Sequence, residues 1–101
     1  GVLAEGSISI CGIGSVVASL KLGDTRKESL EDIWHHNAVF KTIREGVPAQ
    51  LRGICSRCIL RAVCLGKCRA EAYYRTNDIL APLFFCEEAH RMGLFPEGRI
   101  L

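Results

Sequence analysis

The sequence has no apolar stretch approaching the roughly 18 consecutive residues that a membrane span requires. It also lacks a Walker-type phosphate loop and a G-x-S-x-G elbow, the motifs of nucleotide binding and serine hydrolysis. Neither charge sign dominates, since 13 Lys and Arg stand against 11 Asp and Glu. This balance, without repeats or low-complexity segments, excludes a disordered tail, a collagen-like chain and a polycation. The 101 residues, 49% of them hydrophobic, therefore predict one small globular domain over 1–101.

Cysteine, by contrast, is abundant and clustered. The chain has six cysteines; Cys11 stands alone and the others follow the pattern C-x2-C-x5-C-x3-C-x17-C, at Cys55, Cys58, Cys64, Cys68 and Cys86. Disulfides usually close longer loops, and a disulfide-dense secreted scaffold has ~8–10% cysteine or more. A C-x2-C pair instead lets a tight turn aim both sulfurs at one centre. The spacing thus favours a metal or cluster site, and a disulfide-stapled secreted domain is the least favoured interpretation.

The remaining pattern predicts a small α+β fold. An alternating segment at 7–10 indicates a strand, and the apolar residues of 16–22 supply a second, so we expect a β-hairpin region over 1–28. Ser29 has the character of a helix cap and Asn37 of a second one, which predicts a helical region over 29–46, with Trp34, Phe40 and Ile43 in the core.

The C-terminal part of the sequence predicts a cysteine-rich, metal-stabilised region over 53–92. We expect 53–68 to be mostly loop, because its order would come from the metal. Helices are predicted over 65–75 and 84–92, with Gly93 capping the second one. Phe84 and Phe85 are expected to shield the site beside Cys86.

The residue types are compatible with either zinc or an iron–sulfur cluster, and they favour the iron–sulfur cluster. Structural zinc sites commonly pair two C-x2-C knuckles, and only one is present. Six basic residues between 52 and 75 face a single acid, Glu71. They would offset the negative charge of a thiolate-bound cluster, or they form a solvated basic face; charge alone does not separate the two. Nucleic-acid contact by Arg57, Arg61 and Arg69 is a weak alternative, because the net charge is only +2.

The cysteine pattern resembles the SPASM domain, whose second half follows C-x2-C-x5-C-x3-C, a gap and a last cysteine. Gly6 to Cys11 is G-x4-C, similar to the end of the family's first half, and 22–24 with 29–34 resemble the stretch between the halves. The similarity extends over about 5–90. The family's first cysteine would lie before Gly6, beyond the start of this sequence.

This resemblance implies two auxiliary [4Fe-4S] sites. One set is complete, with Cys55, Cys58, Cys64 and Cys86 as ligands of the second auxiliary cluster. Cys11 and Cys68 would belong to the first auxiliary cluster, whose other ligands lie upstream. Because thiolates also favour zinc, that metal is the expected substitute in a fragment purified in air.

SPASM domains form the C-terminal part of many radical S-adenosylmethionine enzymes that modify peptides and proteins. The resemblance implies that auxiliary clusters relay the electron released from the substrate radical, or engage the substrate. The sequence lacks the CxxxCxxC motif of the catalytic cluster. We therefore expect a C-terminal fragment that is not catalytic alone, since S-adenosylmethionine would bind the missing barrel.

The resemblance also implies partners and a location. The expected partners are the N-terminal barrel of the same polypeptide and a peptide or protein substrate, with no nucleic acid and no membrane, in the cytoplasm. The alternative that remains is a stand-alone structural zinc-binding interaction module, which would use the same four thiolates.

Overall fold

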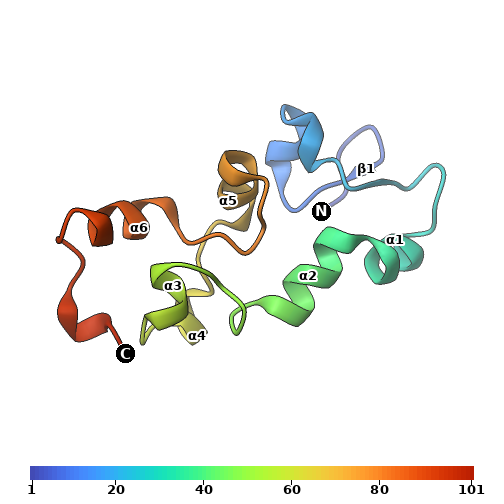
Figure 1. The fold of residues 1–101 in the computed structure, drawn as a ribbon. Helices are drawn as coiled ribbons and strands as arrows, with labels where there is room; N and C mark the ends of the chain where they lie inside the picture. The colour runs from blue at the N-terminus through green and yellow to red at the C-terminus, as the bar shows by residue number, and fades with distance from the viewer. The chain divides into compact units, whose positions relative to one another are not determined.

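The computed structural model describes all 101 residues, which divide into two compact units, Gly1–Arg44 and Glu45–Leu101. The first begins with a two-stranded antiparallel hairpin, and helices follow along the chain, so the predicted α+β class is confirmed (Figure 1). No helix has the length and apolar character needed to cross a membrane. The assignment of residues 1–101 to a single domain stays a prediction.

The hairpin pairs β1 (Ser7–Ile8) with β2 (Gly23–Asp24). The predicted strand at 7–10 is therefore present but shorter, whereas the strand predicted within 16–22 is wrong. Between the two strands the chain forms two 3₁₀ turns, Gly12–Ser15 and Ala18–Leu20, and the second lies where the strand was predicted. Gly14, in the first turn, packs directly on the buried side chain of Ser9. A Cβ on residue 14 would lie 2.3 Å from Ser9 Oγ, so the close packing requires glycine.

Two short helices follow, as the caps predicted. Ser29 Oγ accepts a hydrogen bond from the Asp32 N–H at 3.1 Å, and α1 runs over Leu30–His36. Asn37 Oδ1 accepts from the N–H groups of Val39 and Phe40, and α2 runs over Ala38–Gly46. A side-chain acceptor satisfies N–H groups that a helix start leaves free, so each cap fixes where its helix begins.

The predicted core position of Trp34 is wrong. Its side chain is 47% exposed, whereas the preceding residue Ile33 is 3% exposed and fills the core. The Trp34 ring contacts Phe40 and lies under the Arg44 guanidinium, 4.6 Å from its centroid. Phe40 and Ile43 are half-buried.

The second unit contains α3 (Ile54–Arg57), α4 (Arg61–Cys64), α5 (Arg69–Thr76), α6 (Phe84–Arg91) and a 3₁₀ turn at Glu97–Arg99. The segment expected to be mostly loop thus includes two single-turn helices. The helix predicted from residue 65 begins only at Arg69, because Leu65, Gly66 and Lys67 all have left-handed φ angles. The last helix ends one residue before the predicted boundary, with Gly93 in the left-handed region.

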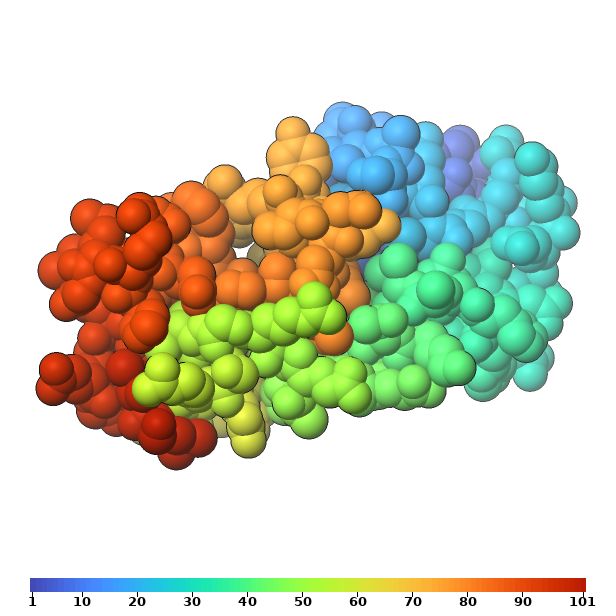
Figure 2. Space-filling view, viewed as in Figure 1, coloured from blue at the N-terminus to red at the C-terminus, as the bar shows by residue number.

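The C-terminal segment packs on the start of this unit. Ile100 forms an isolated antiparallel bridge with Cys58, and Leu101 donates its N–H to the Arg57 carbonyl at 2.7 Å. In Figure 2 the red C-terminal residues accordingly lie against the yellow-green residues around α3. Buried apolar side chains from along the unit form its core: Leu51, Ile54, Ile79, Leu80, Ala81 and Phe95.

Candidate functional site

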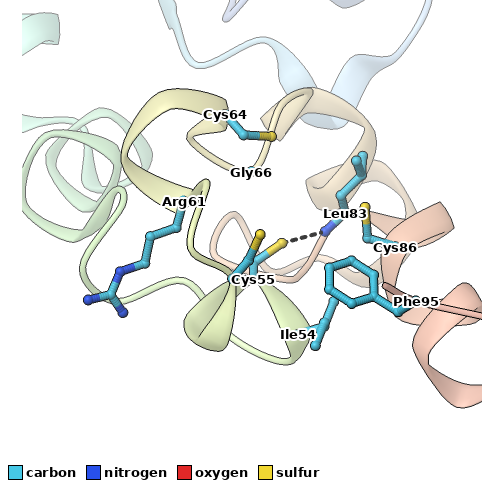
Figure 3. A pocket seen from close by; sticks show the side chains of 9 residues that line it. Ile54, Cys55, Arg61, Cys64, Gly66, Leu83, Cys86 and Phe95 are labelled. Atoms are coloured by element: carbon cyan, nitrogen blue, oxygen red, sulfur yellow. Dashed lines mark hydrogen bonds between the residues drawn. The ribbon is translucent and has the colours of Figure 1, made fainter. Parts of the chain in front are cut away.

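Four thiols of the second unit line one cavity (Figure 3). They are contributed by α3, the residue that follows it, the end of α4 and the first turn of α6: Cys55, Cys58, Cys64 and Cys86. Ile54, Leu83 and Phe95 supply apolar lining, and Arg61 and Gly66 complete it. The cavity therefore gathers the same four cysteines that the resemblance to SPASM domains groups as one ligand set.

Backbone N–H groups point at the sulfurs of the C-x2-C pair. Cys55 Sγ accepts a hydrogen bond from the Leu83 N–H at 3.3 Å, shown as a dashed line in Figure 3. Cys58 Sγ accepts from the Leu60 N–H at 3.4 Å. Such donors favour the thiolate form, which is the form that binds metal. The turn thus places two sulfurs at the cavity, where one receives a hydrogen bond from nearby Leu60 and the other from distant Leu83.

A polar contact ties α3 to α6. Glu87 Oε2 accepts a hydrogen bond from the Ile54 N–H at 2.7 Å and so satisfies a free N–H group at the start of α3. Gly53, just before α3, has φ +58, and a Cβ there would lie 2.5 Å from Glu87 Oε2. This contact holds the helix of Cys55 next to the helix of Cys86.

Left-handed residues separate Cys64 from Cys68. The turn at Leu65, Gly66 and Lys67 ends α4 and reverses the chain before α5 begins. Cys64 lines the cavity, whereas Cys68 does not; its Sγ instead accepts a hydrogen bond from the Glu71 N–H at 3.4 Å and caps α5. The four-residue spacing therefore does not place the two thiols on one helical face.

Burial affects the thiols of the cavity unequally. Burial raises the pKa of the Cys55 thiol, and the hydrogen bond from Leu83 acts in the opposite direction. Partial burial also raises the pKa of Cys86. Because metals bind thiolates, loading the cavity requires these thiols to lose protons, so binding weakens as the pH falls.

The remaining predicted site residues lie elsewhere. Cys11 is exposed in the first unit, at the start of its first 3₁₀ turn, and its partnership with Cys68 stays a prediction. Phe84 and Phe85 do not line the cavity, so their predicted shielding role is wrong; Phe95 takes that place. Phe95 could not be predicted from the sequence, because no periodic pattern links it to the cysteines.

The donor set of the cavity fits a metal–thiolate site, because its four possible ligands are all cysteine sulfurs. Zinc takes its four sulfurs at ~2.3 Å from one point, whereas iron–sulfur clusters take four cysteine thiolates on separate iron atoms. Four thiols bordering a shared cavity, two of them with N–H donors, have the chemistry that an iron–sulfur cluster requires.

Comparison with known proteins gives one family. The model of SPASM, described as an iron-sulfur cluster-binding domain, matches residues 1–59, more than half of the 101 residues. The matched range includes Cys11, Cys55 and Cys58 and ends before the other three cysteines. No curated protein and no solved structure matches the chain.

Proposed function

Because the chain belongs to the SPASM family of iron–sulfur cluster-binding domains, we propose that its second unit holds one [4Fe-4S] cluster on Cys55, Cys58, Cys64 and Cys86. The observation that carries this proposal is the single cavity that these four thiols line. A bound cluster supplies one-electron redox capacity. The chain's own residues hold it with four thiolates, donate N–H groups to two sulfurs, and limit water with Ile54 and Phe95.

The proposal extends to the role of the domain. We propose an auxiliary cluster domain of a radical S-adenosylmethionine maturase, which relays an electron or engages a peptide or protein substrate. Cys11 and Cys68 would contribute to the first auxiliary cluster, with its other ligands outside these 101 residues, and the catalytic barrel of the same polypeptide would be the partner. The six unpaired cysteines support a reducing compartment such as the cytoplasm.

Anaerobic reconstitution tests the cluster and its zinc alternative together. The full chain is incubated with iron and sulfide, or separately with zinc, and bound metal and acid-labile sulfide are measured. We expect about four irons and four sulfides per chain, as one cubane contains. A Cys11→Ala/Cys68→Ser double variant is the control, because it keeps the cavity and an oxygen cap on α5. One tightly bound zinc with no capacity for iron would favour the structural zinc module instead.

The hydrogen bond from Leu83 to Cys55 is expected to raise the reduction potential of the cluster. N–H donors to sulfur stabilise the additional negative charge of the reduced state. Leu83 has φ −61, which proline adopts without strain, so Leu83→Pro removes this N–H and leaves the backbone path intact.

Leu83→Ala is the matched control, because it removes the same side chain and keeps the N–H. In a redox titration, we expect the proline variant to be reduced about tenfold less readily than the alanine variant, ~59 mV for a one-electron couple. Equal potentials in the two loaded variants would show that this hydrogen bond does not tune the cluster.

A further inference from the structure

One basic residue of the cysteine-rich segment differs from the others in burial. Arg69 is 7% exposed. The remaining five are exposed or half-buried: Arg52, Arg57, Arg61, Lys67 and Arg75. Arg52 and Arg75 pair with carboxylates. In Figure 3 the Arg61 guanidinium points away from the sulfurs, and it donates a hydrogen bond to the Ser56 carbonyl. Five of the six basic residues between 52 and 75 therefore belong to the solvated surface, and only the charge of Arg69 is buried.

The Arg69 guanidinium binds two segments of backbone that frame the cavity. Nη1 donates to the carbonyls of Ile79 and Ala81 at 3.0 and 2.5 Å, and Nη2 donates to the Gly66 carbonyl. Gly66 itself lines the cavity, and Ala81 lies two residues before Leu83, which also lines it. A Cβ at residue 66 would lie 2.6 Å from Nη2, so the close approach requires glycine there.

The buried charge of Arg69 has no carboxylate partner. All three acceptors are neutral carbonyls, none of the ion pairs includes Arg69, and its buried Nε has no hydrogen-bond partner. Burying an uncompensated charge is costly, so an opposite charge nearby is expected. Burial lowers the pKa of Arg69, and negative charge on the Cys55, Cys68 or Cys64 sulfur would act in the opposite direction.

We propose that Arg69 is a positioning residue and buried counter-charge for the cluster site, which holds the backbone at Gly66 and Ala81 and raises the reduction potential. This inference rests on the proposed cluster. Reduction adds one electron, supplied in a titration by the electrode, to a site that four thiolates already make negative. A fixed cation in a poorly screened interior stabilises that extra charge more than a solvated one does.

Three variants of the full chain separate charge from structure. Arg69→Gln removes the charge, Arg69→Lys keeps the charge and loses the fork of hydrogen bonds, and Lys67→Gln removes an exposed charge two residues away. Each is reconstituted with iron and sulfide, checked for fold by circular dichroism, and titrated electrochemically. Arg69→Gln is expected to be at least tenfold harder to reduce than the parent, ~59 mV for a one-electron couple. Arg69→Lys and Lys67→Gln should shift less than that.

The outcomes decide the inference separately from the proposed function. A parent chain that binds no iron overturns the cluster itself, whereas a loaded Arg69→Gln with the parental potential overturns only the counter-charge. If Arg69→Gln holds no cluster, Arg69→Lys decides: loading with the parental potential supports the inference. Failure of the lysine variant to load overturns the counter-charge role and leaves only the positioning role, because the site would then require the guanidinium geometry and not the charge.

Discussion

Cys58→Ala is expected to abolish cluster loading and to remove the stabilisation that the metal gives to the second unit. The Cys58 sulfur lines the cavity and accepts the Leu60 N–H, and its backbone pairs with Ile100. Alanine keeps the backbone pairing and deletes only the ligand. Bound iron should therefore fall from about four per chain to near zero, because a cubane needs four thiolates.

The effect on stability should appear only in the loaded protein. Metal binding to a small domain is folding free energy, amounting to ~10 kcal/mol or more for structural zinc in small peptides. In the metal-free chain, Cys58→Ala removes one half-buried sulfur and should cost only about 1 kcal/mol. Thermal melts of parent and variant, each with and without reconstitution, measure both quantities.

Cys11→Ala is the matched control for this experiment. It removes the same atoms from an exposed cysteine of the first unit, which does not line the cavity. The control should load and melt like the parent. If Cys58→Ala also keeps about four irons and the parental melt, the ligand assignment of the second cluster is wrong.

Local signals explain which parts of the fold could be predicted. Ser29 and Asn37 cap α1 and α2 through side chains only two or three residues from their donors, so the sequence contains all that fixes these helix starts. The strand predicted within 16–22 failed because apolar content alone does not distinguish a strand from 3₁₀ turns packed around Gly14.

Long-range contacts account for what was missed at the site. Leu65 and Lys67 adopt left-handed φ angles although neither is glycine, so the residue types do not predict this backbone conformation. Phe95 reaches the cavity from beyond α6, and Ile100 pairs with Cys58 across the unit. The burial of Arg69 likewise depends on carbonyls ten and twelve residues away. The family resemblance that rests on the cysteine spacing predicts the ligands, whereas only the fold shows which residues surround them.

Gly53→Ala is expected to destabilise the second unit strongly, for two separable reasons. Gly53 has φ +58 and ψ −145, a region that is essentially restricted to glycine and costs ~1–3 kcal/mol for other residues. An added Cβ would also lie 2.5 Å from Glu87 Oε2 and 2.7 Å from Pro82 Cγ. Glu87 would have to leave the Ile54 N–H, and an unsatisfied half-buried donor costs ~1–3 kcal/mol more.

Substitutions at two other glycines separate the cost of backbone strain from the cost of the steric clash. Gly93 has φ +74 but open space around its Cα, so Gly93→Ala measures backbone strain without the clash. Gly98 has neither a left-handed φ nor a close neighbour, so Gly98→Ala should be nearly neutral. At ~4–8 °C per kcal/mol for a domain of this size, Gly53→Ala should lower the Tm by at least ~10 °C, and by more than Gly93→Ala does.

The loss should extend from stability to metal binding. The Glu87 contact joins the helices of Cys55 and Cys86, so displacing its carboxylate separates two of the four proposed ligands. We therefore expect Gly53→Ala to take up less iron on reconstitution even below its melting temperature, whereas Gly93→Ala and Gly98→Ala should load fully. A Gly53→Ala chain that melts no lower than Gly93→Ala would mean that Glu87 relaxes freely and that its bond to Ile54 does not hold the site together.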